Sequence, residues 1–318
     1  MDRVHAEMRR VLKNVPGARR LVRMSRTMRS QVLLGPFWPM WRTRLASRPG
    51  MSLSKFVAAV LQAGDIACDV GANVGRTSLL MASGVGKSGL VCAFEPNPAC
   101  FAELARSSKR SWHRNLRAYA LALSDFDGPT TLLVDQRDTG VASTLIPAHA
   151  RRETVWHKAT YAPIMITATT LDAFCERVHL APSFLKIDVE GGEEMVIRGG
   201  ARIIAKHLPV IWFECWAGVE NGIQINDHLG HLDQLGNLGY SFFIATIFKL
   251  DGSWVSEESV CNPRQLLRLE PQDIRKVRSI GCDIVAAAPH HLARLENLHL
   301  ISSADAMSHM SQSRPRPG

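Results

Sequence analysis

Short apolar runs alternate with longer helical stretches through the middle of the chain, and this alternation constrains the fold more than any other feature. The sequence predicts strands over residues 66–70, 90–94, 116–123, 184–187, 210–213, 240–248 and 283–288. It predicts helices over 74–82, 99–109, 193–206 and 227–238, with hairpin-like pieces near 130–134 and 164–169. Strands separated by helices pair in parallel and are covered on both faces. The predicted fold class is therefore α/β, with a doubly wound, mostly parallel sheet.

The chain divides into three sections of different composition. Residues 1–50 form a basic N-terminal extension, residues 51–290 carry the alternating pattern, and residues 291–318 are polar and expected to form a disordered tail. The net charge of +9 comes from the first section, which holds twelve Arg and Lys residues against two acids. Because the rest of the chain is close to neutral, nucleic acid is not the expected partner.

Cysteine usage and the absence of long apolar runs indicate the compartment. The seven cysteines include no CxxC pair, which excludes a disulfide framework and a zinc knuckle. No apolar run approaches the roughly 20 residues needed to span a bilayer. Charges throughout residues 1–13 are unlike a secretory signal. The predicted location is cytoplasmic, with peripheral membrane contact left open.

The first predicted strand runs into a glycine-containing loop that begins with an acid. The stretch from Asp69 to Gly75 reads Asp-Val-Gly-Ala-Asn-Val-Gly, and its glycines allow a ligand to approach the backbone. A dinucleotide would place its pyrophosphate here, where a carboxylate is a poor neighbour. A cofactor with an amino group and a sulfonium cation favours that carboxylate. Asn73 and Arg76 also stand where a nicotinamide-binding loop requires glycine.

Acids follow the next two strands as well. Glu95 ends the second strand, twenty residues beyond Gly75, where an acid takes both ribose hydroxyls of a nucleoside. Asp125 follows the third strand, where an adenine amino group is expected. Each acid alone is more often a solvated turn residue or a helix cap. Acids at three successive strand ends indicate a nucleoside-containing cofactor.

With these motifs the chain resembles the FkbM-type class I methyltransferases over about residues 60–290. The motifs are the loop at 69–75, Phe94-Glu-Pro-Asn-Pro, Ala122-Leu-Ser-Asp, Thr170-Leu-Asp, Leu185-Lys-Ile-Asp-Val-Glu-Gly with a glutamate at 193 or 194, Phe213-Glu and Val285-Ala-Ala-Ala-Pro. The resemblance implies a seven-stranded sheet, S-adenosylmethionine as the methyl donor, and a hydroxyl acceptor on a sugar or secondary metabolite. The expected cofactor-binding residues are Asp69, Gly71, Asn73, Gly75, Glu95, Asn97, Ser124 and Asp125. The family does not explain the basic extension.

Two acids at neighbouring strand ends are the candidate catalytic residues. Asp188 ends the fourth strand, beside the expected methyl group, and Glu214 ends the fifth. They can act as base and orienter, or share a divalent metal such as Mg²⁺, a requirement that the sequence leaves open. Capping or hydrogen bonding at strand ends is the structural alternative for both. His157, His179 and His207 are alternative bases that nothing in the sequence places near the cleft.

Residues 1–45 combine basic charge with apolar side chains. The apolar residues at 4, 8, 11 and 15 fall on one helical face, and aromatic residues follow at 37, 38 and 41. This pattern favours an interfacial anchor on a membrane or glycolipid. It is equally typical of a solvated helix whose aromatic end packs on the domain, and an Arg-rich transit peptide is a third interpretation.

O-methylation of a hydroxyl on a sugar, glycolipid or secondary metabolite is the leading function, with a small-molecule or glycan acceptor. N- or C-methylation stays open because the acceptor pocket lies in loops that the motifs do not cover. A nicotinamide-dependent oxidoreductase is disfavoured by Asp69 and Asn73. A cofactor-binding protein without catalysis is disfavoured because every expected acid and glycine is present.

Overall fold

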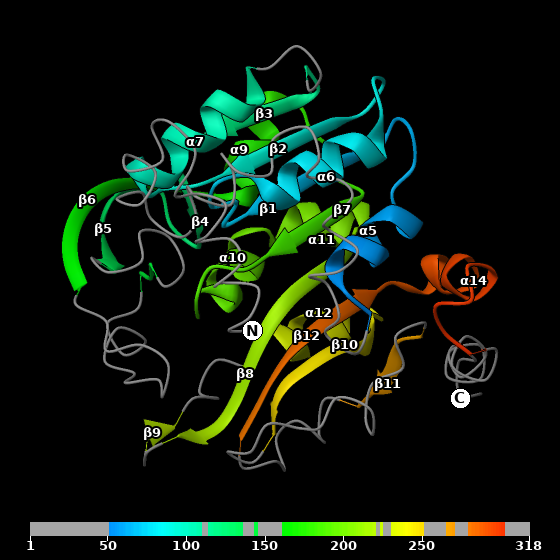
Figure 1. The fold of residues 1–318 in the computed structure, drawn as a ribbon. Helices are drawn as coiled ribbons and strands as arrows, with labels where there is room; N and C mark the ends of the chain where they lie inside the picture. The colour runs from blue at the N-terminus through cyan, green and yellow to red at the C-terminus, as the bar shows by residue number, and fades with distance from the viewer. Residues whose placement is uncertain are drawn as a thin grey trace, which may run out of the picture. The chain divides into compact units, whose positions relative to one another are not determined.

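The computed structural model has an α/β architecture in which helices cover a large sheet (Figure 1). It describes residues 51–109, 114–135, 143–145, 161–220, 223–224, 230–250, 265–270 and 279–302. The basic extension over residues 1–50 and the chain beyond residue 302 lie outside this described part. Within it, no helix combines the length and the apolar character needed to cross a bilayer.

The large sheet is mostly parallel and contains the predicted strands. Its order is β11 (Leu267–Leu269), β10 (Ser241–Leu250), β12 (Ser279–Ala287), β8 (Val210–Glu220), β7 (Phe184–Ile187), β1 (Ile66–Val70), β2 (Leu90–Phe94) and β3 (Leu116–Tyr119). The strands from β3 to β8 are parallel, whereas β12 runs antiparallel between β8 and β10. The predicted fold class is confirmed. Two short strands, β11 at one edge and β9 (Ile223–Gln224) beside β8, add to the seven expected strands.

The strand order reverses between β1 and β7. From β1 the chain adds β2 and β3 on one side, and it later places β7 on the other side of β1. The loops that follow β1 and β7 therefore leave the sheet side by side at its carboxyl edge. Doubly wound sheets bind their ligands at such a point.

Helices cover both faces because successive strand residues point to opposite sides. The core on one face is packed by α9 (Leu171–Val178), α10 (Glu193–Gly199), α11 (Ala201–His207) and α12 (Gly230–Asn237). The core on the other face is packed by α5 (Leu53–Val60), α6 (Arg76–Val85), α7 (Pro98–Ser108) and α14 (Pro289–Asn297). Cys68 and Val70 of β1 face the first core and Ala67 faces the second. Asp69 therefore points toward the second face.

A separate three-stranded sheet has the order β4 (Ala122–Ser124), β6 (Tyr161–Thr170) and β5 (Gly128–Asp135). The predicted hairpin-like pieces form its antiparallel β5–β6 pair. The prediction of one strand over 116–123 is wrong, because the chain leaves the large sheet after Tyr119 and pairs again as β4, in parallel with β6. Buried Leu123 then packs into the first core, and the end of β4 lies against α10.

The C-terminal boundary also differs from the sequence-based expectation. Residues 291–302, expected in a disordered tail, contain most of α14 and the turn that follows it. Four of their apolar side chains are buried: Leu292, Leu295, Leu300 and Ile301. Polar residues outnumber these side chains, but the apolar residues recur at helical spacing and complete the second core. The short helices α5 and α9, capped by Ser52 and Thr170, were also not predicted.

Candidate active site

The loop after β1 is shaped by three residues with positive φ. Gly71, Asn73 and Gly75 have φ angles of +75°, +52° and +85°. A Cβ atom on Gly75 would lie 2.7 Å from Leu104 Cδ1, so glycine at this position lets the start of α6 approach α7. These predicted cofactor-binding residues therefore determine the backbone conformation of the loop.

Gly71 also brings the loop after β1 against the loop after β7. A Cβ atom on Gly71 would lie 1.8 Å from the carbonyl oxygen of Asp188. The backbone N–H of Asp188 donates to the carbonyl of Val70 at 3.1 Å. The expected cofactor loop and the expected acceptor-side acid are thus joined through backbone, with no side chain between them.

Glu95 connects the end of β2 to the same loop. Its side chain is 7% exposed, Oε2 accepts from the backbone N–H of Asn73 at 2.7 Å, and Oε1 accepts from that of Asn97 at 2.8 Å. Burial raises the pKa of Glu95 to about 7, although both hydrogen bonds act to lower it. Each carboxylate oxygen has a further lone pair that a ligand hydroxyl can use.

Asn97 and the segment 143–145 form a bridge that the sequence did not predict. Asn97 Oδ1 accepts from the backbone N–H of Ala99 at 3.0 Å and so caps α7, while its Nδ2 donates to Ser143 Oγ at 3.4 Å. Thr144 Oγ1 donates to the carbonyl of Glu190 at 2.8 Å. The segment therefore connects the loop after β2 with the loop after β7.

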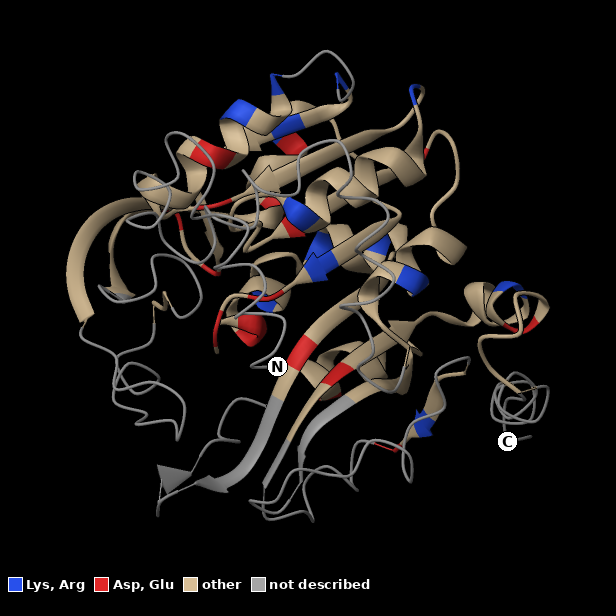
Figure 2. Cartoon of the chain, viewed as in Figure 1, with Lys and Arg blue, Asp and Glu red and all other residues tan. Residues whose placement is uncertain are grey.

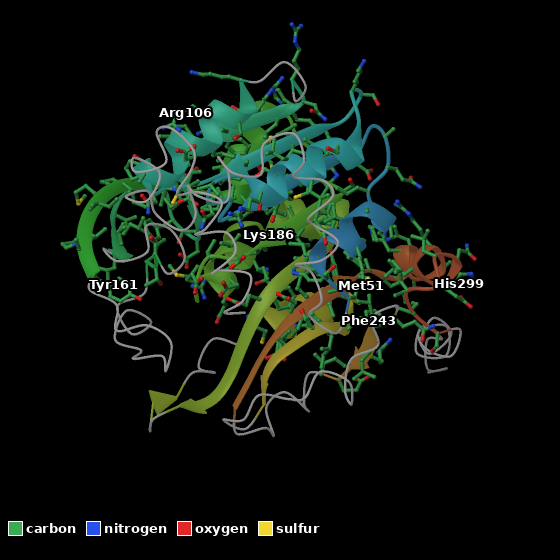
Figure 3. All side chains as sticks on the ribbon, in the orientation of Figure 1. Met51, Arg106, Tyr161, Lys186, Phe243 and His299 are labelled. Atoms are coloured by element: carbon green, nitrogen blue, oxygen red, sulfur yellow. The ribbon has the colours of Figure 1, made fainter. Side chains whose placement is uncertain are left out.

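Lys186 lies at the centre of the site, on the fully buried strand β7 (Figure 3). Its Nζ donates to the carbonyl of Gly71 at 3.0 Å and lies 3.4 Å from Asp69 Oδ1 and 3.1 Å from Asp188 Oδ2. Burial by itself would lower the pKa of Lys186, but Asp188 and Asp69 outweigh it and hold the pKa above its usual value. A buried ammonium group thus connects the first acid of the cofactor loop to the candidate catalytic acid.

Asp69 itself is buried beneath the loop. It has no exposed surface, its Oδ2 accepts from Ser78 Oγ at 2.6 Å, and its Oδ1 faces Lys186. In this arrangement Lys186 connects the Asp69 carboxylate with the rest of the site. The direct contact with a cofactor amino group expected from the sequence stays a prediction, and in this structure the Asp69 carboxylate contacts Ser78 and Lys186.

Ser124 and Asp125 lie against α10. Arg198 donates from Nε and Nη2 to Asp125 Oδ2 at 2.8 and 2.6 Å, and Ser124 Oγ donates to Asp125 Oδ1 at 3.3 Å. A Cβ atom on Gly199 would lie 1.9 Å from the carbonyl oxygen of Ser124, so glycine permits this close packing. The Asp125 carboxylate, expected beside the adenine, is therefore paired with Arg198. Sequence reasoning missed this ion pair.

Acidic side chains also gather on the neighbouring strands β8 and β12 (Figure 2). Glu214 and Asp283 are directly opposite each other in this antiparallel pair, and Thr246 Oγ1 donates a short hydrogen bond to Asp283. Burial raises the pKa of Asp283 to about 6. Burial also raises the pKa of Glu214 well above its usual range, and the neighbouring carboxylates, Asp188 first among them, add to this shift.

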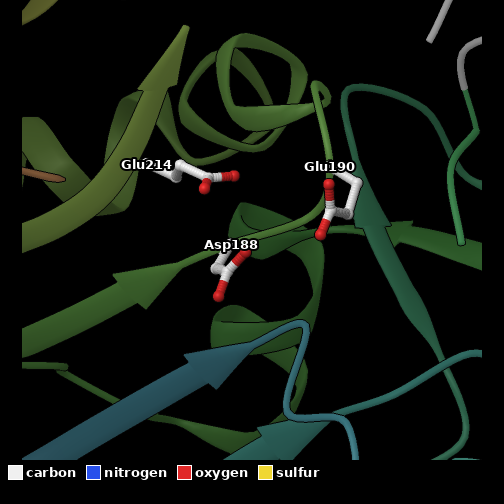
Figure 4. A group of neighbouring side chains, drawn as sticks. All are labelled: Asp188, Glu190 and Glu214. Carbon is white, nitrogen blue, oxygen red and sulfur yellow. The ribbon is translucent and has the colours of Figure 1, made fainter. Parts of the chain in front are cut away.

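Asp188, Glu190 and Glu214 point toward one another (Figure 4). Each offers a carboxylate oxygen, and these oxygens all lie within 4.8 Å of one another. Glu193, at the start of α10, holds the loop that carries Glu190: its buried Oε1 accepts from the backbone N–H groups of Val189 and Gly191 at 3.0 and 3.2 Å.

The structure brings Asp188 and Glu214 together as the strand-end argument expected, and it places the two described candidate histidines, His179 and His207, elsewhere. His179 and His207 lie just before β7 and β8, at the amino edge of the sheet, and His157 lies outside the described residues. Sequence reasoning gave no role to Lys186 or Asp283. Each is a charged residue inside an otherwise apolar strand, and this was the signal that could have identified it.

The sequence profile described as "Methyltransferase FkbM domain" matches residues 69–242. This match covers more than half of the chain and includes every predicted site residue. No curated protein matches the chain significantly in sequence.

Several solved structures are similar to parts of the chain. A methyltransferase FkbM from Methylobacillus flagellatus KT has 12% identity and a TM-score of 0.39, and the match covers 70% of this chain but only 43% of that protein. An S-adenosylmethionine-dependent O-methyltransferase from Thermotoga maritima has 14% identity and a TM-score of 0.36, covering 78% and 69%. Aeropyrum pernix fibrillarin with natively bound S-adenosyl-L-methionine has 12% identity and a TM-score of 0.36, covering 74% and 73%. Similarities at this level identify no reaction.

Proposed function

The chain belongs to the FkbM methyltransferase family and is an S-adenosylmethionine-dependent methyltransferase, and we propose that it methylates a hydroxyl oxygen of a sugar, glycolipid or secondary metabolite. The observation that carries this proposal is the position of Asp188. Its carboxylate is 44% exposed at the end of β7, its backbone touches Gly71 of the cofactor loop, and Glu214 lies beside it. A carboxylate next to the donor loop is suited to take a proton from an acceptor hydroxyl.

The loops at the carboxyl edge fit a nucleoside-containing methyl donor. When bound, S-adenosylmethionine supplies a methyl group to a nucleophile and leaves as its demethylated product. We assign its contacts to the backbone around Gly71, Asn73 and Gly75, and its ribose hydroxyls to Glu95. Asp69 supports this loop through Lys186, because its own carboxylate is buried.

The residues on the adenine side are assigned supporting roles by their contacts. Asn97 caps α7 and orders the loop after β2. Ser124 holds Asp125, whose carboxylate is shared with Arg198. A ligand amino group can still use a further lone pair of Asp125, which is only partly exposed.

Proton removal is the step assigned to the acceptor-side residues. Asp188 would accept the proton of the acceptor hydroxyl as that oxygen bonds to the methyl carbon, and the donor sulfur would keep the electrons of the broken carbon–sulfur bond. Lys186 Nζ holds the Asp188 carboxylate in place through the 3.1 Å contact to Oδ2.

A donor with a labelled methyl group tests this function. The purified chain is incubated with ¹³C-methyl S-adenosylmethionine and with extracts of polar metabolites and glycolipids. We expect a new carbon signal with the chemical shift of a methoxy group. An N-methyl or C-methyl signal instead would contradict O-methylation while keeping the enzyme class.

Substitution of Asp188 tests its role in the same assay. Asp188→Asn keeps the shape of the side chain but removes the base, and it should lower turnover by about 10²–10⁴ with little change in cofactor affinity. Asp65→Asn is the matched control. Asp65 lies just before the amino end of β1, away from the site, and accepts a hydrogen bond from the backbone N–H of Gln62. Near-normal turnover by Asp188→Asn would show that another group removes the proton.

Peripheral contact with a membrane or glycolipid through residues 1–45 forms a second part of the proposal. It is supported by the concentration of Arg and Lys residues in this segment and by the aromatic residues that follow them. Such contact would raise the local concentration of a lipid-bound acceptor around the enzyme.

A further inference from the structure

Three carboxylates reach one point of the site from two different strands. Asp188 follows β7, Glu190 lies two residues further along the same loop, and Glu214 lies on β8. Oxygens bound to one hard cation at roughly 2.1–2.5 Å are themselves roughly 3–5 Å apart. The mutual separation of at most 4.8 Å between these carboxylate oxygens is compatible with a single ion.

Glu214 provides an observation that is independent of this clustering. Its Oε2 atom is buried and has no hydrogen-bond partner among the described residues. Figure 4 shows its carboxylate directed toward Asp188 and Glu190. Because a buried carboxylate oxygen without a donor is costly, this atom is suited to a ligand that a surface acid would not need.

The protein cation near the cluster does not reach this atom. Lys186 Nζ contacts Asp188 Oδ2, Asp69 and the carbonyl of Gly71, on the β1 side of Asp188. Glu214 lies on the other side, where its cross-strand partner is another acid, Asp283. Several acidic groups therefore lie close together on this side of Asp188.

The donor set indicates which cation is suitable. All three side chains supply oxygen, and neither histidine nor cysteine belongs to the group. Carboxylate oxygens select hard divalent ions such as Mg²⁺ and Mn²⁺, while zinc and copper sites use nitrogen or sulfur. Three protein ligands leave about three positions of an octahedral ion for water or for an acceptor oxygen.

We propose that Asp188, Glu190 and Glu214 bind one hard divalent cation, of the Mg²⁺ or Mn²⁺ class, on the acceptor side of the site. The assignment extends the Asp188–Glu214 pair considered from the sequence by a third ligand, Glu190. It rests on the proposed function for its role: an acceptor hydroxyl bound to the cation loses its proton more readily and is held beside the donor loop.

Direct titration with Mn²⁺ tests the site without any methyl acceptor. The full chain is stripped with a chelator and titrated with Mn²⁺ near neutral pH, while electron paramagnetic resonance follows the free ion. We expect saturable binding of one Mn²⁺ per chain, with Mg²⁺ as a competitor. Glu190→Gln and Glu214→Gln should each weaken Mn²⁺ affinity by at least about tenfold, the scale seen when groups around a metal are lost.

A matched acid-to-amide control separates a built site from general attraction of cations. Glu103→Gln removes an acid of α7 that pairs with Arg106, and it should leave Mn²⁺ affinity unchanged. If Glu214→Gln fails to fold, Glu190→Gln still tests the site, because Glu190 lies on a loop and outside both buried cores. Non-saturable binding, or equal affinity in the site variants and the control, would overturn the proposal.

Binding of S-adenosylmethionine to the same samples separates this proposal from the proposed function. Stoichiometric Mn²⁺ binding without S-adenosylmethionine binding would support the cation site and contradict the methyl-transfer role. Normal S-adenosylmethionine binding with no specific Mn²⁺ binding would overturn the cation site. Asp188 acting directly as the base would then remain.

Discussion

Gly71 packs against the carbonyl oxygen of Asp188 so closely that a Cβ atom on Gly71 would lie 1.8 Å from that oxygen. The two residues belong to loops more than a hundred positions apart in the chain, one on the donor side and one on the acceptor side of the site. Their contact arises because β1 and β7 are neighbours at the reversal of the strand order. It fixes the distance between the donor loop and the candidate catalytic carboxylate.

Gly71→Ala should therefore destabilise the protein and weaken S-adenosylmethionine binding. The positive φ of Gly71 costs an alanine roughly 1–2 kcal/mol, and the clash with backbone adds about 1–3 kcal/mol. Gly64→Ala is the control, since Gly64 also has a positive φ but its Cβ would meet nothing closer than Ser88 Oγ at 3.9 Å. Equal losses of unfolding free energy in urea for both variants would show that the Gly71–Asp188 contact contributes nothing specific.

Asp69 and Lys186 should show strong thermodynamic coupling. Lys186→Met leaves Asp69 buried without its cation, and breaking such a pair costs about 3–5 kcal/mol of unfolding free energy. Asp69→Asn should cost less, because Lys186 keeps its contacts with Asp188 and the carbonyl of Gly71. In the Lys186→Met background, Asp69→Asn should cost little or restore stability. A double-mutant cycle in urea measures this coupling, and additive effects would contradict it.

Glu193 should make stability depend on pH. Burial raises its pKa to about 7 from an ordinary value of 4.5. Between these values the folded chain binds a proton that the unfolded chain has released, so stability falls as pH rises through this range. The contribution is up to about 3 kcal/mol, at about 1.4 kcal/mol for each pKa unit.

Glu193→Gln provides the comparison for this pH effect. A single oxygen, Oε1, accepts both backbone hydrogen bonds, so the amide variant can keep both of them. Unfolding free energies measured in chelator at several pH values should fall less steeply for Glu193→Gln than for the unaltered chain. Glu95 titrates in the same direction and leaves part of the slope in both proteins. Identical slopes would show that Glu193 is not the group responsible.

Residues 1–45 should bind anionic vesicles in a salt-dependent manner. Each basic residue near an anionic surface contributes on the order of 1 kcal/mol, and salt screens this attraction. The full chain should sediment with phosphatidylserine vesicles at low salt and be released at high salt. A chain lacking residues 1–45 should stay in the supernatant. Equal sedimentation of both chains would contradict membrane binding through this segment.

The strands and the main loops were predictable because their signals are local. The apolar runs at 66–70, 90–94 and 184–187 became β1, β2 and β7 without a change of boundary. Longer strands were underestimated: β8 was expected to end at Phe213 but continues to Glu220. The break after Tyr119 was missed because Leu116–Leu123 is apolar apart from Arg117, and local pattern does not show which sheet each half joins.

The roles of the site residues depended on contacts that no local pattern records. Asp125 looked available for a ligand until its ion pair with Arg198, seventy-three positions away, was seen. Asp69 was expected beside the cofactor, whereas its buried carboxylate contacts Ser78 and Lys186. Each case concerns a carboxylate whose partner comes from another element or another turn.

By itself the sequence determined the fold class, the family motifs and the set of acids at the carboxyl ends of the strands. These features could be predicted because apolar periodicity and loop motifs depend only on residues that are neighbours in the chain. Only the tertiary structure decided how those acids differ. Parallel pairing placed Lys186 beside Asp69 and left Asp69 buried, while the β7–β8 pairing brought Glu214 to Asp188 and Glu190. Burial and the sign of the nearest charge set the properties of a carboxylate, and both depend on residues that are distant in sequence.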